Sequence, residues 1–319
     1  MLKHKDHFHG SDLEKIEEIY GIKKEDITSF SANVNPLGIS PLLRETLASH
    51  VDAISTYPDR DYTKLRKSIC AYTGAQFENI IVGNGSTELI SLFIQTTHPE
   101  KALILGHTYS EYEREIALEG GHTLYYPLKE ENNFQMDVND LCAQMKDGLD
   151  LLVLCNPNNP TGIPVKKEEV EQLADTCERL GAYLAVDECF CDFLDNSESY
   201  SVIPDLARFT HLFVLKAFTK LYAMAGLRLG YGLCSDSGLL ERLQAVRQPW
   251  SVSGPAQCAG VAALGETDFA ERTRAVLKGE RERLSAALHD LGFQVYPSQA
   301  NYLFFRDREE DGILEKGRL

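Results

Sequence analysis

The chain has 319 residues, enough for one large domain and one smaller domain. Hydrophobic residues make up 43% and charged residues 25%, an ordinary globular composition, and no apolar run approaches the roughly 20 residues of a membrane span. The formal net charge of -16 argues against a nucleic acid or an anionic membrane as main partner. Residues 1–7 lack the apolar core of a secretory signal. We therefore expect a cytoplasmic enzyme that acts on a small molecule.

The eight cysteines are scattered along the chain, and several lie in apolar runs. We expect buried reduced thiols instead of disulfides. Cys189 and Cys191 form a C-x-C pair without a second pair or a nearby histidine, which is not the spacing of a zinc site. The histidines at positions 4, 7 and 9 form a short terminal tract, which is ordinarily solvated. We expect no bound metal.

Short apolar runs alternate with helical patterns between residues 80 and 233. The runs predict strands at 101–106, 122–126, 150–155, 182–187 and 211–216, and the helical patterns predict helices at 88–95, 109–118 and 166–180. Strands and helices in alternation indicate a mostly parallel sheet with helices on both faces. The expected fold is α/β, with a three-layer large domain.

The pattern changes after Trp250 to long, charged helical stretches, notably 268–291, followed by short apolar segments at 292–297 and 302–305. This predicts a connecting helix that leads into a smaller α+β domain. The first 58 residues are rich in turn formers and are predicted to pack with it. The expected organisation is an N-terminal segment at 1–58, a large domain at 59–266, and a connecting helix with a partial small domain at 267–319.

Three polar residues follow apolar runs within a few positions: Asn159, Asp187 and Lys220. In parallel sheets such residues gather at the carboxyl edge of the strands. A lysine that forms a Schiff base with pyridoxal phosphate needs a cation for the phosphate, a carboxylate for the ring nitrogen and a donor for the ring oxygen. Arg228, Asp187 and Asn159 can fill these roles beside Lys220. The alternative for Asp187 is a helix cap or a surface acid.

A glycine-rich turn follows the apolar run at 80–82 and opens a helix. Its amides and hydroxyls, at Gly85, Ser86 and Thr87, are expected to hold the cofactor phosphate at the helix N-terminus. Arg228 lies eight positions after Lys220, and a planar guanidinium can clasp the same phosphate through two hydrogen bonds.

Two aromatic residues and a second lysine need separate interpretations. Tyr109 follows a strand and is expected to begin a helix, so its ring can stack on the cofactor; core packing is the alternative. Tyr57 precedes Pro58 and can be a turn residue only. Lys216 belongs to the strand at 211–216 and lies twelve positions from Arg228, so Lys220 is the expected cofactor lysine.

Three elements occur in this order in the sequence: N-P-N-N-P-T-G at 156–162, D-E-x-F at 187–190, and T-K followed by G-L-R at 219–228. On the basis of these elements, the sequence resembles the fold type I aminotransferase family over almost the whole chain. Two groups within that family come closest. They are the histidinol-phosphate aminotransferases and the L-threonine O-3-phosphate decarboxylases of cobalamin side-arm synthesis.

Several segments favour the decarboxylases. Residues 8–11 look like their A-H-G-G-N segment, and F-S-A-N-V-N-P-L-G at 30–38 resembles their F-S-A-N-I-N-P-L-G. The resemblance implies that His9, Gly10 and Asn33, with Asn159, contact a phosphorylated substrate. Phe190 stands where the aminotransferases usually have a tyrosine that bonds the ring oxygen. The implied reaction is decarboxylation of L-threonine O-3-phosphate to 1-aminopropan-2-yl phosphate, and transamination of histidinol phosphate is the alternative.

The resemblance also implies that Tyr57 reaches the cofactor phosphate of a neighbouring subunit, so a homodimer is expected. It places Thr219 among the cofactor-binding residues. Ala217 departs from the family, which usually has a serine or threonine there on the phosphate. The family also continues beyond position 319 with arginines that hold the substrate carboxylate, and Arg318 is a poor substitute for them. A third alternative is therefore a cofactor-binding remnant or regulatory subunit without turnover.

Overall fold

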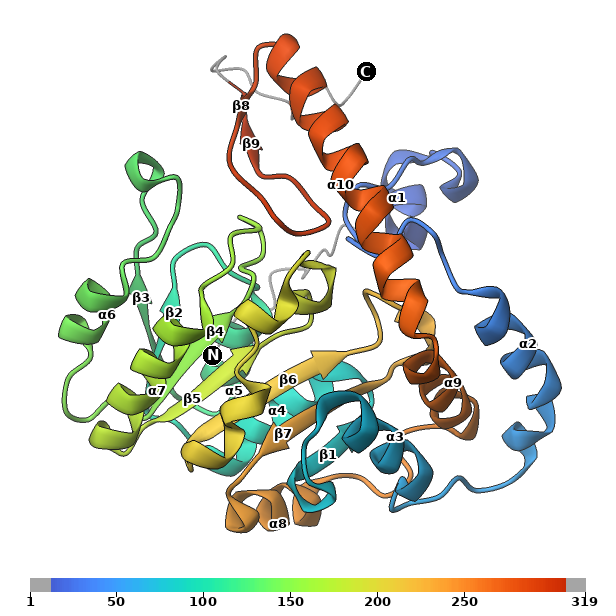
Figure 1. Cartoon of the computed structure of the whole chain (residues 1–319), viewed down its shortest axis with the longest axis horizontal. Helices are drawn as coiled ribbons and strands as arrows, with labels where there is room; N and C mark the ends of the chain where they lie inside the picture. The colour runs from blue at the N-terminus through green and yellow to red at the C-terminus, as the bar shows by residue number, and fades with distance from the viewer. Residues whose placement is uncertain (1–12, 308–319) are drawn as a thin grey trace.

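The computed structural model describes residues 13–307 (Figure 1). Two of the predicted substrate residues, His9 and Gly10, lie outside the described residues, and so does Arg318. The remaining predicted site residues all fall within the described range.

A seven-stranded sheet forms the centre of the molecule, in the order β1-β7-β6-β5-β4-β2-β3 (Figure 1). Its strands are β1 (Ile80–Gly83), β2 (Lys101–Leu105), β3 (His122–Tyr126), β4 (Leu151–Cys155), β5 (Tyr183–Asp187), β6 (Leu212–Ala217) and β7 (Gly230–Cys234). Strands β3, β2, β4, β5 and β6 run parallel, whereas β7 is antiparallel to both β6 and β1. The predicted α/β fold with a mostly parallel sheet is confirmed. Strand β7 was not predicted, because its glycine-rich run gives a weak strand pattern.

Helices cover both faces of the sheet. On one face, α4 (Gly85–Thr97) and α8 (Ser237–Val246) pack on β7 and β1, and α5 (Glu111–Leu118) packs on β2 and β3. On the other face, α7 (Lys167–Leu180) packs on β5 and α3 (Thr63–Thr73) packs on β1. Helix α6 (Val138–Gln144) lies beside α7, and α9 (Gly254–Gly265) lies beside α3.

Two hydrophobic cores lie on the two faces of the sheet, because successive side chains of a strand point to opposite faces. In β4, Leu152 and Leu154 belong to the core under α3 and α7, whereas Val153 and Cys155 belong to the core under α4, α5 and α8. Burial on both faces explains why these strands read as continuous apolar runs. The same alternation in β5 places Asp187 on the α5 face, two positions after Ala185.

A second unit stands above the sheet (Figure 1). It contains the long helix α10 (Thr267–Asp290) and the short antiparallel pair β8 (Gln294–Val295) and β9 (Phe305–Arg306). The N-terminal segment carries α1 (Leu13–Tyr20) and α2 (Pro41–Ser49). Asn35 Nδ2 donates to Thr273 Oγ1 of α10 at 2.8 Å, and Asn301 Nδ2 donates to the backbone oxygen of Asn33 at 2.8 Å. The N-terminal segment thus contacts the upper unit, and the two boundaries between the three predicted parts of the chain stay a prediction.

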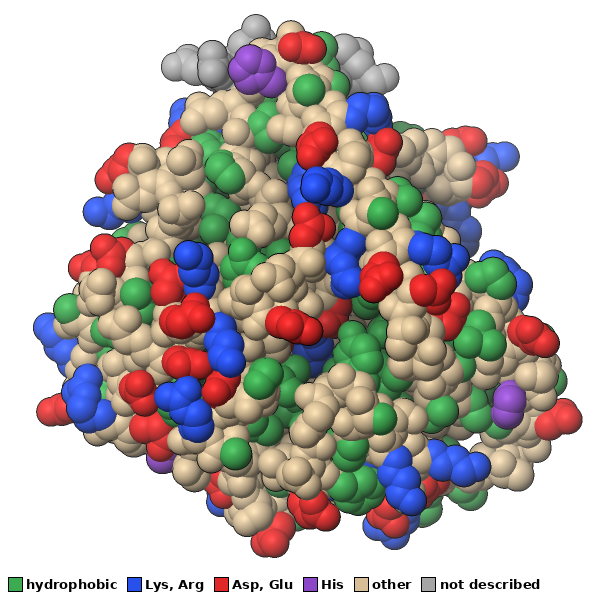
Figure 2. All heavy atoms as spheres, viewed as in Figure 1, with side chains coloured by type: hydrophobic (Ala, Val, Ile, Leu, Met, Phe, Trp, Pro, Cys, Tyr) green, Lys and Arg blue, Asp and Glu red, His purple; other side chains and the backbone are tan. Residues whose placement is uncertain are grey.

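The surface in Figure 2 mixes acidic and basic side chains along α10 and over α6 and α7. None of the helices within residues 13–307 is long and apolar enough to cross a membrane. The eight cysteines are free thiols, and five of them are buried. In the same described range, histidine, cysteine and acidic side chains form no cluster of three that fits a metal ion.

Candidate active site

A cavity of about 380 Å³ opens at the carboxyl edge of the parallel strands. The ends of β4, β5 and β6, the first turn of α4 and the N-terminal segment at 31–34 contribute to its wall. Most of the sequence-predicted site residues line it: Asn33, Ser86, Thr87, Tyr109, Asn159, Asp187, Thr219, Lys220 and Arg228. Residues from distant parts of the chain therefore converge on one volume, as the strand-end argument predicts.

Asp187 ends β5, where it pairs in register with Cys155 of β4 and Leu215 of β6. Its side chain is buried, which excludes the surface-acid alternative. The Tyr112 hydroxyl donates to Asp187 Oδ2 at 2.6 Å, and the Cys189 amide donates to Oδ1 at 2.9 Å. A buried carboxylate with two donors is held in one orientation, as a partner of a cationic ring nitrogen must be.

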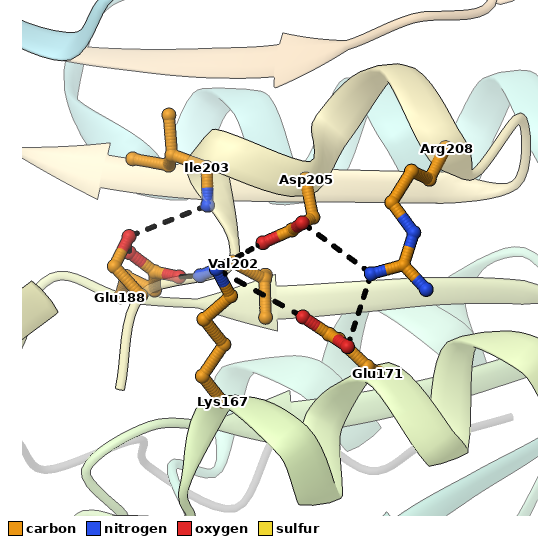
Figure 3. Close-up of polar contacts among 8 residues, drawn as sticks. Lys167, Glu171, Glu188, Val202, Ile203, Asp205 and Arg208 are labelled. Atoms are coloured by element: carbon orange, nitrogen blue, oxygen red, sulfur yellow. Dashed lines mark hydrogen bonds and ion pairs between the residues drawn. The ribbon is translucent and has the colours of Figure 1, made fainter. Parts of the chain in front are cut away.

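Hydrogen bonds and ion pairs hold the chain segment that follows Asp187. The buried carboxylate of Glu188 accepts from Ser201 Oγ at 2.7 Å and from the Val202 amide at 2.9 Å. Next to it, an ion-pair network joins α7 to the 3-10 turn Ile203–Arg208 (Figure 3). Its contacts are Lys167 to Asp205 at 2.5 Å and to Glu171 at 3.9 Å, and Arg208 to Glu171 at 3.0 Å and to Asp205 at 3.4 Å. These bonds tie the chain that follows the Asp187 strand to a neighbouring helix.

Lys220 follows β6 and reaches into the cavity. Its Nζ donates to the backbone oxygen of Ala32 at 3.0 Å and lies 5.3 Å from the centre of the Phe190 ring. Burial lowers the pKa of Lys220, and the nearby charge of Arg228 lowers it further. A lowered pKa increases the fraction of neutral amine, which is the form that attacks an aldehyde.

Lys216 behaves differently, although it lies only four positions earlier. Its side chain is buried on the face of β6 that points away from the cavity, where its Nζ pairs with Asp192 Oδ2 at 2.8 Å. Burial alone would lower the pKa of Lys216, but the charge of Asp192 and of other acidic neighbours holds it well above the ordinary value. Lys216 is therefore a charged structural lysine that does not line the cavity, and Lys220 is the lysine that does.

The first turn of α4 and Arg228 form a cradle for an anion. Gly85 begins α4 with φ +79, and a Cβ at this position would lie 2.6 Å from Arg228 Nη2. A Cβ at Gly230 would lie 2.7 Å from the Ser86 amide nitrogen. The two glycines thus allow the guanidinium and the β7 backbone to approach the helix N-terminus closely. Backbone amides at a helix start and a guanidinium together favour a phosphate group.

We expect Gly85→Ala to weaken cofactor binding about 10- to 100-fold, because the new methyl group displaces the Arg228 guanidinium. Equilibrium dialysis with pyridoxal phosphate measures this loss. Gly74→Ala is the matched control, since Gly74 also has a positive φ, of +75, but no heavy atom within 4 Å of the added Cβ. Equal losses of affinity in both variants would mean that backbone strain, and not the cradle, explains the effect.

Tyr109 lines the cavity but does not begin a helix, because α5 starts two residues later at Glu111. The turn before α5 therefore carries it. Its ring packs edge-to-face on Tyr112, with centroids 5.5 Å apart, and its hydroxyl is hydrogen-bonded with Thr87. Burial, with the charge of Glu111, raises the pKa of Tyr109 to about 12, so the phenol stays neutral.

Asn33 and Phe190 form the wall beside Lys220. Asn33 has a left-handed backbone with φ 47, which asparagine tolerates better than most residues. Phe190 packs edge-to-face on Tyr302 at 5.0 Å, and the Tyr302 hydroxyl donates to the backbone oxygen of Asn158 at 3.0 Å. The phenyl ring of Phe190 carries no hydroxyl, so it offers the cavity no hydrogen-bond donor.

Tyr57 is the one described cofactor residue that lies away from the cavity. Its side chain is 83% exposed, and its ring lies 5.0 Å from that of Trp250. Sequence reasoning missed Tyr112, Tyr302 and the carbonyl of Ala32. Their roles depend on contacts between segments that are distant in the sequence, which no local pattern indicates.

The model of the family described as aminotransferase class I and II matches residues 25–314. The chain belongs to this family. Among its relatives, the threonine-phosphate decarboxylase of Salmonella typhimurium is 35% identical over 312 residues, which is 98% of this chain and 85% of that protein. The histidinol-phosphate aminotransferase of Roseiflexus castenholzii is 38% identical over 304 residues, covering 92% and 78%. The crystal structure of the histidinol-phosphate aminotransferase from Clostridium acetobutylicum superposes with a TM-score of 0.81 at 29% identity, covering 89% and 86%.

This member of the class I and II aminotransferase family is a pyridoxal-phosphate-dependent enzyme. The cavity fits that cofactor in three respects. Hydrogen bonds fix the Asp187 carboxylate, and the first turn of α4 with Arg228 forms an anion cradle that a Cβ at Gly85 would fill. Lys220 lines the same cavity, and its pKa is lowered. The predicted cofactor is thus confirmed at the level of the family.

Proposed function

We propose that this enzyme decarboxylates L-threonine O-3-phosphate to 1-aminopropan-2-yl phosphate. The observation that carries the proposal is Phe190, which fills the wall beside Lys220 without a hydroxyl. The ring oxygen then depends on Asn159, the pattern that resembles the decarboxylases. The decarboxylase relative that aligns over 98% of the chain supports the same choice.

Each cavity residue has a proposed task. Lys220 would hold the cofactor covalently and would return a proton to the substrate carbon. Asp187 keeps the ring nitrogen protonated, and Tyr109 stacks on the ring. Gly85, Ser86, Thr87, Thr219 and Arg228 hold the phosphate, and Asn159 donates to the ring oxygen. Pyridoxal phosphate itself supplies an electron sink for the bond that breaks.

Substrate orientation decides which bond to the α-carbon breaks, because only a bond perpendicular to the ring is weakened. Asn33 lines the cavity beside Lys220, and its segment is bonded to that lysine through the Ala32 carbonyl. We propose that Asn33, with His9 and Gly10, holds the substrate phosphate.

Transamination of the histidinol-phosphate type is the second candidate. The observation that favours it is the 38% identity to a histidinol-phosphate aminotransferase over 92% of the chain. The residues proposed to hold the cofactor would serve both reactions, because their partner is the cofactor and not the substrate side chain.

A side-by-side assay tests the proposal. Purified enzyme loaded with pyridoxal phosphate receives L-threonine O-3-phosphate, or histidinol phosphate with 2-oxoglutarate, and carbon dioxide and glutamate are measured. We expect carbon dioxide and 1-aminopropan-2-yl phosphate from the first mixture. Glutamate from the second mixture alone overturns the decarboxylase in favour of the aminotransferase. Cofactor bound without turnover of either substrate supports a non-catalytic protein.

We further propose a homodimer in which Tyr57 reaches the cofactor phosphate of the neighbouring subunit. Exposed apolar side chains include Val51 at 56% and Ile54 at 73%, shortly before Tyr57 in the sequence, and Trp250 at 43%, whose ring lies 5.0 Å from that of Tyr57. Clustered exposed apolar groups favour burial against another protein surface. We expect sedimentation equilibrium to give twice the chain mass of 35.7 kDa. We also expect Ile54→Lys to give monomers with weakened cofactor binding; a monomeric wild type with full cofactor affinity contradicts the proposal.

A further inference from the structure

The Asp187 carboxylate is held by protein donors on both of its oxygens. Tyr112 Oη donates to Oδ2 at 2.6 Å, and the Cys189 amide donates to Oδ1 at 2.9 Å. Tyr112 is 1% exposed and Asp187 is 6% exposed, so water cannot readily replace either bond. Rotation of the carboxylate would leave a buried polar group without a partner, which is costly.

The position of Tyr112 follows from the helix that carries it. Tyr112 lies in the first turn of α5, which packs on β2 and β3. The edge-to-face contact with Tyr109 and the core that it shares with Cys155 fix the Tyr112 ring in the wall of the cavity, which Asp187 also lines. Its hydroxyl thus donates to Asp187 from the first turn of α5.

In the hydrogen bond between Tyr112 and Asp187, the tyrosine is the donor and the carboxylate is the acceptor. Burial, together with the negative charge of Asp187, raises the pKa of Tyr112 well above its ordinary value, so the phenol keeps the proton that it donates to the carboxylate. The hydrogen bond fixes the direction in which the carboxylate points. Each carboxylate oxygen has about two acceptor sites. The carboxylate can therefore still accept from a group inside the cavity.

We propose that Tyr112 is a positioning residue of this active site: it holds the Asp187 carboxylate in one orientation, so that this carboxylate can keep the ring nitrogen of the cofactor protonated. The proposal rests on the role proposed above for Asp187 and is independent of the substrate. No proton leaves Tyr112 in any step; the proton that matters stays on the ring nitrogen.

Other titratable groups face this pair from each neighbouring element. They are Tyr109 before α5, Cys155 at the end of β4, Cys189 after β5, Lys220 and Arg228 after β6, and Tyr302 of the upper unit. Burial raises the pKa of Cys155 to about 12 and the pKa of Cys189 well above its ordinary range, so both thiols remain neutral. Lys220 is the group whose protonation the test follows.

Tyr112→Phe tests the proposal in enzyme saturated with pyridoxal phosphate. We expect the pH midpoint of the visible absorption of the lysine-linked cofactor to rise by about one unit. A ring that is less protonated withdraws less electron density, so the linked nitrogen keeps its proton to higher pH. We also expect the dissociation constant of the cofactor to increase about 10-fold. Both readouts are independent of turnover.

Tyr126→Phe is the matched control. The Tyr126 hydroxyl also donates to an aspartate, Asp140 Oδ2, at 2.9 Å, and Tyr126 is buried outside the cavity. We expect it to lower the melting temperature of the cofactor-free protein as Tyr112→Phe does, and to leave the absorption midpoint and cofactor affinity unchanged. If Tyr112→Phe changes only the melting temperature, Tyr112 is a core tyrosine and the proposal is wrong.

A second variant covers the case in which Tyr112→Phe does not fold. Tyr112→His keeps a ring N–H donor. We expect its absorption midpoint to rise by less than the one unit expected of Tyr112→Phe. The variant Tyr112→Leu cannot donate a hydrogen bond to Asp187. If it has the wild-type absorption midpoint and normal cofactor affinity, the proposal is wrong. Because no substrate is added, failure of the decarboxylase assay leaves these results unaffected.

Discussion

Lys220→Ala is expected to abolish turnover, with a loss of at least about 10,000-fold in kcat. The variant loses both the covalent link to the cofactor and the amine that returns a proton to the substrate carbon. The structure supports this through the position of Nζ in the cavity and the lowered pKa of Lys220. Borohydride reduction followed by peptide mass analysis measures the link directly: wild-type protein carries the reduced cofactor on the Lys220 peptide, and the variant carries none.

Lys216→Arg is the control for this experiment. It keeps a cation opposite Asp192, where the buried pair lies on the other face of β6 from the cavity. We expect the cofactor link to persist in Lys216→Arg with kcat within a few-fold of wild type, as for a charge-conserving change outside the site. A Lys220→Ala protein that still carries reduced cofactor, on the Lys216 peptide, would show that the wrong lysine was assigned.

The motifs allowed most of the cavity to be predicted because each one sits at a strand end. Asn159 and Lys220 follow β4 and β6, and Asp187 ends β5. These strands are buried on both faces, so they were visible in the sequence as apolar runs. Parallel strands bring their carboxyl ends together whatever the loops do, so strand identification was sufficient to bring these residues into one site.

Contacts between distant segments were not predictable in the same way. The Tyr112 hydroxyl and the Ala32 carbonyl become partners of Asp187 and Lys220 only after α5 and the N-terminal segment have packed. Their residue types occur throughout the chain and carry no pattern. The antiparallel strand β7 was missed for a local reason, because its glycines provide the close approaches seen at Gly230 and Gly232 but weaken the strand pattern.

Asp187→Asn is expected to lower kcat roughly 100- to 1,000-fold while the cofactor stays covalently bound. The amide preserves size, but it carries no charge to hold a proton on the ring nitrogen. The buried Tyr112 hydroxyl can still donate to the amide oxygen, so the fold should survive. Kinetics with whichever substrate the wild type converts, together with the melting temperature, measure the two effects separately.

A modified cofactor tells whether the lost charge is the reason. Pyridoxal phosphate methylated at the ring nitrogen carries a permanent positive charge, so it needs no carboxylate to keep a proton in place. We expect it to restore part of the activity of Asp187→Asn and to give wild-type enzyme no gain. Asp140→Asn, which changes the aspartate bonded by the Tyr126 hydroxyl outside the cavity, should behave as wild type with both cofactors. No rescue by the methylated cofactor would mean that Asp187 contributes shape instead of charge, and the roles of both Asp187 and Tyr112 would have to be reassigned.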